Sequence, residues 1–290
     1  MFIGIDHGTT AMRFSTGKEK FKISREEARH FSAGDLARLS PLDEIEGIAV
    51  CYSMGDGISA ITDIRKVNNR GVISREGAGK HIGGGTRVYD EIKESGLPAV
   101  VIPGLHRASP TDPRFKAYSH QASPEKIGIL YEVVHDLGED VVVCDASSNT
   151  VTLLATGGQI TGAFDACVFA PGTRHGALDV DAIRRIDRGE STANDAFLHA
   201  GVNYTVPPDF RVETMAMFAA MECAAMLLIN PGAKVALAGS MAPAIAPGVE
   251  ALLLKKVAVY DEWCAARGLA RIARDVFSGA PAILGLAVDR

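Results

Sequence analysis

Two short polar segments in this sequence have the composition of turns that bind phosphate. Residues 6–10 read Asp-His-Gly-Thr-Thr, and residues 145–150 read Asp-Ala-Ser-Ser-Asn-Thr. Main-chain N–H groups and hydroxyls in such turns donate hydrogen bonds to phosphate oxygens. The leading aspartates, Asp6 and Asp145, are candidate catalytic residues and Mg²⁺ ligands, because proteins hold this ion through one or two carboxylates, water and phosphates. The candidate phosphate contacts are Gly8, Thr9, Thr10, Ser147, Ser148 and Thr150.

The alternative for either segment is a hairpin turn without a ligand, because turns favour Asp, Gly, Ser and Thr for conformational reasons alone. The repetition favours binding, since a purely structural turn gives no reason for both copies to carry the same polar set. If the two turns face each other, they clamp one phosphate chain and one metal ion between them.

Apolar segments with the pattern of β-strands flank both turns and must position them. Each turn lies in a strand–turn–strand–turn–strand series, and Asp6 and Asp145 occupy matching places in the two series. This repetition predicts an internal duplication, which fixes the architecture. The predicted strands are 2–5, 11–15 and 21–23 in the first copy and 141–144, 150–155 and 160–164 in the second, with 47–54 and 234–241 as a further matching pair.

Helical patterns fall between these strands. Residues 214–228 are apolar nearly all round, which predicts a deeply buried helix, and 249–267 are amphipathic, with Gly268 as the expected C-terminal cap. Residues 65–125 are rich in Gly, Pro, Arg and His and predict a loop-rich insertion. We therefore expect two domains, 1–135 and 136–290, with helices also over 178–188 and from 192.

The composition excludes several classes of protein. The chain has 290 residues, 47% of them hydrophobic, which suits two modest domains with real cores. A net charge of −5 argues against nucleic acid or an anionic membrane as partner. The longest apolar stretch, 215–229, is too short for a bilayer and contains Glu222. The five cysteines are scattered, and the sequence shows no leader pattern. Together these two features predict a cytoplasmic protein.

Taken together, the two hairpins resemble the phosphate loops of the superfamily of acetate and sugar kinases, Hsp70 and actin. Ser147 and Ser148 stand where that superfamily usually has glycine. Residues 235–239, followed by Ser240, are similar to its adenosine-contacting strand and turn. The resemblance implies an α/β fold of two duplicated ribonuclease H-like (actin-like ATPase) domains, with an interdomain cleft that binds ATP and Mg²⁺ and with Gly239 and Ser240 near the adenosine.

A further segment, residues 171–179, resembles the G-T-R-S-G-x-x-D sequence of acetate and butyrate kinases, whose arginine faces the transferred phosphoryl group. The resemblance implies this role for Arg174, whose planar guanidinium suits phosphate or carboxylate oxygens; the alternative is a surface arginine. Residues 101–107 lack the aspartate that is central to acyl-phosphate kinases, which argues against acetate kinase activity. The candidate substrate-binding residues are His106, Arg107, His120 and His175, and solvated loop cations are the simpler alternative for the first three.

The whole sequence is most similar to the methanogenesis marker protein 12 family of methanogenic archaea. The segments that carry this resemblance are 1–10, 83–86, 102–107, 172–187 and 192–197. It implies an archaeal cytosolic protein connected with methanogenesis, but it names no substrate. Three functions stay open: an ATP-dependent phosphotransferase or ATPase with a carboxylate or hydroxyl acceptor, a nucleotide-dependent switch or assembly factor for a methanogenic enzyme, and a scaffold that has lost nucleotide binding. The expected partners are a nucleotide and, in addition, either a small-molecule carboxylate or another protein. A homodimer is left open.

Two other patterns carry little weight. Residues 74–81 resemble a P-loop but lack its first glycine and its Ser or Thr. The eight histidines show no zinc-ligand spacing.

Overall fold

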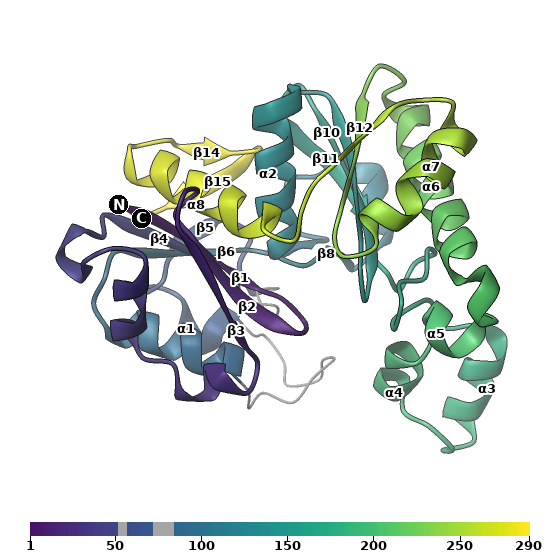
Figure 1. The fold of residues 1–290 in the computed structure, drawn as a ribbon, viewed down its shortest axis with the longest axis horizontal. Coiled ribbons are helices and arrows are strands. Elements are labelled where there is room, and N and C mark those ends of the chain that lie inside the picture. The colour runs from purple at the N-terminus through teal and green to yellow at the C-terminus, as the bar shows by residue number, and fades with distance from the viewer. Residues whose placement is uncertain (52–56, 72–83) are drawn as a thin grey trace. The chain divides into compact units, whose positions relative to one another are not determined.

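The structure, a computed structural model, describes residues 1–51, 57–71 and 84–290. Contacts divide the described chain into two compact units (Figure 1). Unit 1 comprises residues 1–136, 158–160 and 263–290, and unit 2 comprises 137–157 and 161–262. The end of predicted strand 47–54, the P-loop-like residues 74–81 and Gly83 lie wholly or partly outside the described residues.

A mixed sheet forms the centre of unit 1. Its order across the described residues is β14-β15-β5-β6-β4-β1-β2-β3, and β1, β4 and β6 run parallel. β2 and β3 continue from β1 as an antiparallel meander, and β5 is antiparallel to β6. The strands are β1 (Phe2–His7), β2 (Ala11–Ser15), β3 (Lys20–Ser24), β4 (Gly47–Cys51), β5 (Ile61–Asp63), β6 (Ala99–Ile102), β14 (Ala282–Ile283) and β15 (Leu286–Asp289).

Unit 2 repeats the order of the central strands of unit 1. Its sheet has the order β11-β10-β9-β12-β13, in which β9, β10 and β11 form the meander and β12 and β13 are parallel to β9. The corresponding order in unit 1 is β3-β2-β1-β4-β6. The predicted α/β class and duplication are therefore confirmed. The strands are β9 (Val141–Ala146), β10 (Thr150–Thr156), β11 (Gln159–Phe164), β12 (Lys234–Ala238) and β13 (Val257–Val259).

The sequences of the central strands explain their burial. Every residue of β4 and of β9 is buried, as expected for parallel strands covered on both faces. On the other side of β1, Phe14 stacks on Phe21 with ring centroids 4.5 Å apart and belongs to the core of unit 1. The two aspartate-bearing turns are thus held by rigid, buried strands.

Three helices pack in unit 1: α1 (Gly84–Glu94), α2 (Glu125–Leu137) and α8 (Cys264–Phe277). Helix α8 packs on β1 and on β4, which explains why residues 263–290 belong to unit 1, although their place in the sequence predicted the second domain. Residues 99–102, assigned to the loop-rich insertion, form the sheet strand β6. After β6, the short strands β7 (Leu105–His106) and β8 (His120–Ala122) pair with each other.

The helix expected over 249–267 is wrong. Helix α7 (Ala242–Leu253) ends at Leu254, whose backbone is left-handed (φ 52°), and the chain then forms β13 before α8 begins. Gly268 lies inside α8 and caps nothing. Local amphipathicity was misleading here, because the break comes from one backbone conformation and from the pairing of β13 with β12.

The other helices belong to unit 2. They are α3 (Val180–Asp187), α4 (Ala193–Leu198), α5 (Val202–Thr205) and α6 (Arg211–Ile229). Short 3₁₀ helices occur at Glu27–His30, Ala33–Arg38, Leu42–Glu44, Asn68–Gly71, Pro113–Ala117 and Pro208–Phe210.

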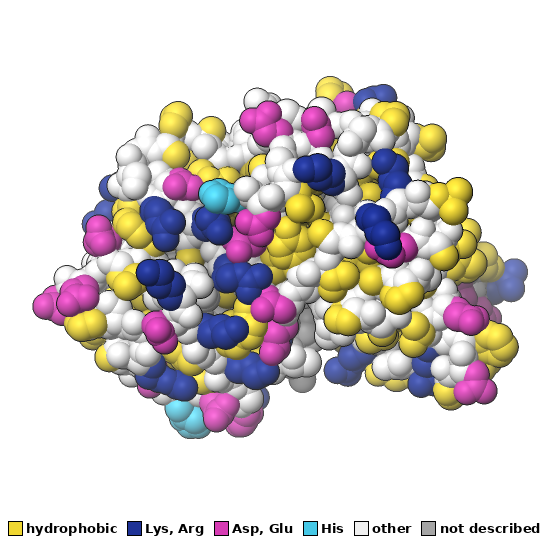
Figure 2. All heavy atoms as spheres, turned by 45° about the horizontal axis from the view of Figure 1, so that its top comes forward, with side chains coloured by type: hydrophobic (Ala, Val, Ile, Leu, Met, Phe, Trp, Pro, Cys, Tyr) yellow, Lys and Arg dark blue, Asp and Glu magenta, His cyan; other side chains and the backbone are white. Residues whose placement is uncertain are grey.

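Helix α6 is buried on one side only, so the prediction of a deeply buried helix was wrong. Its inner face packs on β9 and β10, whereas Met217, Met221 and Leu228 are 38%, 47% and 85% exposed. Among the described residues, all large hydrophobic side chains that are exposed belong to unit 2, apart from Met1 and Leu42. Figure 2 shows hydrophobic side chains on the surface, interspersed with charged ones. Residues 208–229 are the only described segment long and apolar enough to cross a membrane, but Glu222 on this helix is buried and its inner face packs on the sheet of unit 2.

Candidate functional site

Asp6 lies near the carboxyl end of β1 and is only 4% exposed. Arg13 of β2 is its partner in the sheet register, and Arg13 Nη1 lies 3.5 Å from Asp6 Oδ2. The Cys51 thiol, at the end of β4, approaches Asp6 Oδ1 to 4.0 Å. The buried carboxylate is therefore paired with a cation at the turn where phosphate contacts were expected. Thr9 and Thr10 are exposed at the tip of this turn.

A second arginine flanks the same turn. Arg25 Nη1 lies 2.8 Å from His7 Nε2 and 3.5 Å from the carbonyl oxygen of Gly8. Burial and the charge of Arg25 lower the pKa of His7 to about 4, so the imidazole is neutral at pH 7. The turn thus has a guanidinium on each side, which suits a phosphate group. Sequence reasoning missed Arg13 and Arg25; pairing β1 with β2 residue by residue would have indicated Arg13.

A buried ion pair at the start of α2 adds a second carboxylate to this region. Glu125 lies 3.1 Å from Lys126 Nζ and accepts a 2.6 Å hydrogen bond from Ser123 Oγ, while its Oε2 is buried and has no hydrogen-bond partner among the described residues. Burial alone raises the pKa of Glu125, but the Lys126 charge and the hydrogen bonds outweigh it and hold the pKa below its usual range. The negative charge also acts on His7 and Cys51. Glu125 belongs to no motif, so no sequence pattern pointed to it beyond a helix start.

Asp145 occupies in unit 2 the place that Asp6 occupies in unit 1. It is the fifth residue of a six-residue strand, as Asp6 is, and it is 4% exposed. Gly239, at the end of the parallel strand β12, lies against its carboxylate with φ +90°. A Cβ at Gly239 would come within 2.9 Å of the Ala146 carbonyl carbon, so both the backbone angle and the space require glycine. The neighbouring Ser240 is exposed.

The loop at 171–175 sits on the turn that follows Asp145. The Thr173 amide donates to the Ser147 carbonyl (2.9 Å), and the Arg174 amide donates to the Ser148 carbonyl (3.2 Å). Thr150 Oγ1 donates to the Pro171 carbonyl at 2.9 Å. Residues 145–150 and 171–175, which the sequence indicates as two separate motifs, are therefore parts of one structure. The Arg174 side chain is exposed beside the turn.

His175 locks this loop in place. Its Nδ1 contacts Asn149 Oδ1, and its ring stacks on Phe197 of α4 with centroids 5.1 Å apart. Burial and the neighbouring Arg174 charge lower its pKa, so the ring is neutral at pH 7. The side chain is 8% exposed. These contacts hold His175 against the turn that follows Asp145 and against α4, and its expected contact with substrate stays a prediction.

Glu222 of α6 anchors the other end of the same loop. Its carboxyl accepts hydrogen bonds from the Ala170 amide (3.1 Å) and from Thr152 Oγ1 (2.7 Å). Burial raises the pKa of Glu222 to about 8, although these two bonds oppose the shift. A carboxyl that is mostly protonated at neutral pH therefore ties the helix, the sheet and the Arg174 loop together.

The other expected substrate contacts gather in unit 1. His106 and His120 are opposite each other in the β7–β8 pair. His106 and Arg107 line a cavity of about 380 Å³. Both His106 ring nitrogens are engaged, because Nε2 lies 2.9 Å from the Ile58 carbonyl and Nδ1 accepts from the Ala108 amide at 3.3 Å. The ring therefore links two chain segments by hydrogen bonds, and neither of its nitrogens is available for proton transfer.

The described residues contain no group of three or more His, Cys, Asp or Glu side chains able to hold a metal ion. Asp6 and Asp145 fit Mg²⁺ only in the way that nucleotide-binding proteins use it, with phosphates and water supplying most of the ligands. The buried Glu125 Oε2, which no group in the described part of the chain hydrogen-bonds, is consistent with such use, since a hydrated cation satisfies an acceptor of this kind.

Comparison with known proteins identifies the family. A protein of Methanosarcina mazei named UPF0285 protein is 44% identical over an alignment of 323 positions, gaps included, which covers 99% of both chains. The UPF0285 protein of Methanothermobacter thermautotrophicus is 42% identical and covers 100% of this chain and 98% of its own. The chain belongs to the UPF0285 family. No protein-family model matches this UPF0285 chain.

Solved structures show the same fold as this UPF0285 chain at low identity. A propionate kinase from Francisella tularensis matches with a TM-score of 0.58 and 10% identity, over 94% of this chain and 98% of its own. A ROK family glucokinase from Streptomyces griseus, in complex with glucose and AMPPNP, matches with a TM-score of 0.51 and 12% identity, over 94% and 99%. At these identities the likeness shows the fold alone, and it confirms the expected fold class.

Proposed function

We propose that this UPF0285 protein binds ATP with Mg²⁺ and is a phosphotransferase or ATPase. The observation that carries the proposal is the convergence in unit 2 of three segments: the turn after Asp145, the Arg174 loop seated on it, and Gly239 against the carboxylate. The Asp6 turn of unit 1, with Arg13 and Arg25 beside it, supplies an equivalent phosphate-binding element. The glucokinase of the same fold is in complex with AMPPNP, which supports the choice of nucleotide.

In this proposal each group has a defined task. Mg²⁺ would supply charge neutralisation of the phosphates, held by Asp6 and Asp145 with water. The turn amides and hydroxyls orient the phosphate chain, with the adenosine near Gly239 and Ser240. The exposed guanidinium of Arg174 faces the transferred group, and positioning with charge stabilisation is the main source of rate in phosphoryl transfer.

Removal of the Arg174 guanidinium tests this assignment. We expect Arg174→Ala to lower the rate of ADP release from Mg-ATP on the order of 10²-fold, as for loss of one preorganised transition-state donor. Arg185→Ala, an exposed arginine of α3 in the same unit, is the matched control and should leave the rate unchanged. Equal rates for wild type and Arg174→Ala would remove Arg174 from the chemistry.

A second function, a nucleotide-dependent switch or assembly factor for a methanogenic enzyme, is favoured by one observation. His106 has both ring nitrogens bonded to main chain, so the segment after β6 supplies no general base from this residue. Measuring ADP release with a panel of carboxylates and alcohols separates the two functions. Stimulation by a small molecule supports the transferase, and stimulation only by a protein fraction supports the switch.

The remaining assignments complete the proposal. We place the protein in the methanogenesis marker protein 12 family and in the cytoplasm, with a protein or carboxylate partner, no nucleic acid and no membrane, and with a homodimer left open. Its membership of a family found in methanogens supports a connection with methanogenesis.

A further inference from the structure

The cavity beside Arg107 has walls from two separate segments of unit 1. One wall is Gly57–Ser59, and the other is His106–Ala108 with Ser119. The His106 ring joins these walls, since it contacts the Ile58 carbonyl on one side and the Ala108 amide on the other. The cavity volume of about 380 Å³ is at the lower end of the range for small-molecule sites.

The topology of the sheet places this cavity at the same edge as Asp6. Because β1, β4 and β6 are parallel, their carboxyl ends lie along one edge, and His106 follows β6 at that edge. β5 is antiparallel to β6, so residues 57–60 enter β5 from the same edge. Ligands of α/β sheets bind outside the carboxyl ends of the strands.

Among the described residues that line the cavity, Arg107 is the one with a formal charge, and this charge is positive. Arg107 donates its main-chain N–H to the Ser119 carbonyl and its Nε to the Lys116 carbonyl, both at 3.1 Å. Its two terminal nitrogens have no hydrogen-bond partner among the described residues, so the fork that binds carboxylates remains open. The hydroxyls of Ser59 and Ser119 add neutral donors, while Ile58 and Ala108 are apolar.

We propose that this cavity binds a small organic carboxylate, with its charged end on Arg107 and its carbon chain on Ile58 and Ala108. The described lining residues include no acidic side chain, which argues against a cationic ligand, and the volume and the apolar surface favour a ligand larger than a bare inorganic anion. Carboxylate binding stands on the cavity alone. The further role of this carboxylate as phosphoryl acceptor rests on the proposed function.

Titration with butyrate, n-butanol and inorganic phosphate tests the proposal on the full chain. Saturation-transfer NMR should show saturable butyrate binding that is at least tenfold tighter than binding of n-butanol. Inorganic phosphate has no carbon-bound protons, so its affinity is measured by competition against the butyrate signal and should also be at least tenfold weaker. We expect Arg107→Gln to weaken butyrate binding at least tenfold. Arg114→Gln, an exposed arginine of the same segment that pairs with Asp112, should change it less than twofold.

A substitution that fills the cavity provides a second, independent test. Ala108→Leu keeps Arg107 and places a larger side chain at an exposed position of the lining, so it should also abolish butyrate binding without unfolding the protein. Three results would each overturn the proposal. The first is an equal loss of butyrate affinity in Arg107→Gln and Arg114→Gln, and the second is an unchanged butyrate affinity in Ala108→Leu. The third is n-butanol or phosphate binding as tightly as butyrate. Mg-ATP titration of the same samples is a separate readout: normal ATP binding without butyrate binding leaves the proposed function intact.

Discussion

Replacing Gly268 with alanine is expected to lower the free energy of unfolding of unit 1 by roughly 2–3 kcal/mol, the range for overpacking at a tight contact. Alanine normally stabilises a helix interior by about 1 kcal/mol relative to glycine. At Gly268, however, the added Cβ would meet the backbone of Gly128 on α2, including its carbonyl carbon at 2.7 Å. Backbone cannot move aside as a flexible side chain does, so the two helices must separate.

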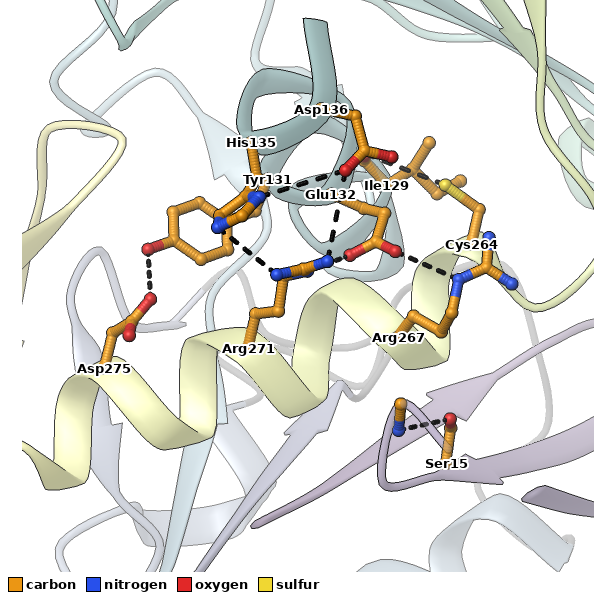
Figure 3. A network of polar contacts seen from close by, with 11 residues as sticks. Ser15, Ile129, Tyr131, Glu132, His135, Asp136, Cys264, Arg267, Arg271 and Asp275 are labelled. Atoms are coloured by element: carbon orange, nitrogen blue, oxygen red, sulfur yellow. Dashed lines mark hydrogen bonds and ion pairs between the residues drawn. The ribbon is translucent and has the colours of Figure 1, made fainter. Parts of the chain in front are cut away.

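The consequences of this separation extend along both helices. Figure 3 shows the polar contacts that join them: Glu132 of α2 pairs with Arg267 (3.0 Å) and Arg271 (2.6 Å) of α8. Tyr131 of α2 donates to Asp275 of α8 at 2.5 Å. Because Glu132 is almost fully buried, a shift that lengthens its ion pairs leaves a poorly solvated carboxylate.

Urea unfolding followed by the fluorescence of Trp263, the only tryptophan, measures this effect beside α8 itself. Gly34→Ala is the matched control, because the nearest atom to its added Cβ is Ser32 Oγ at 3.5 Å, an ordinary contact. We expect the control to match wild type within about 0.5 kcal/mol, as for surface substitutions away from special features. A Gly268→Ala protein as stable as the control would show that the α2–α8 contact is looser than described.

The second large effect concerns the pH dependence of stability through Glu222. Its folded pKa, raised to about 8 by burial, exceeds the ordinary value of 4.5. The contribution of Glu222 protonation to the free energy of unfolding is therefore complete below the ordinary pKa, and it is lost as the pH rises through the folded pKa. Between pH 6.5 and 8 we expect the free energy of unfolding to fall by about 1.6 kcal/mol from this group, because the slope of 1.36 kcal/mol per pH unit decreases as the carboxyl itself ionises near pH 8.

Glu222→Gln should flatten this slope and make the protein more stable than wild type at pH 8. The amide is uncharged and its oxygen still accepts a hydrogen bond from Thr152 or the Ala170 amide. A side-chain hydrogen bond with Cys223 and burial both raise the pKa of Cys144, which lies near Glu222. Burial raises the pKa of Cys167 to about 11, so both thiols stay neutral in this range. The charge of Asp165 also raises the pKa of Glu222.

Urea titrations at pH 6.5, 7.2 and 8.0 measure the Glu222 effect, with the exposed Glu213→Gln on the same helix as control. The control should keep the wild-type slope. A Glu222→Gln protein that keeps this slope, or that is less stable than wild type at pH 8, would contradict the assignment of a protonated carboxyl.

The duplicated sheets could be predicted from the sequence because each central strand is a local pattern. β2 matches its predicted range, and β9 and β10 differ from theirs by two residues or fewer at one end. The turns after Asp6 and Asp145 follow from the same patterns. The convergence of residues 171–175 with residues 147–149 could not be read in this way, because hydrogen bonds between distant segments leave no local periodicity.

The errors have the same cause. Gly268 has the sequence appearance of a helix cap, and only contact with Gly128 explains a glycine inside α8. Leu254 gives no warning of a left-handed conformation, so α7, β13 and part of α8 merged into one predicted helix. Glu125 and Arg25 were missed because their roles depend on neighbours far away in the sequence.

Calorimetric titration with Mg-ATP tests the central claim most directly. We expect saturable binding by wild type and at least tenfold weaker binding by both Asp6→Asn and Asp145→Asn. Asp63→Asn is the control: it removes a buried carboxylate at the end of β5, which runs antiparallel to β6 and so ends at the opposite edge of the sheet. Absence of binding by wild type, or affinities of the two variants equal to that of Asp63→Asn, would contradict the proposed nucleotide site.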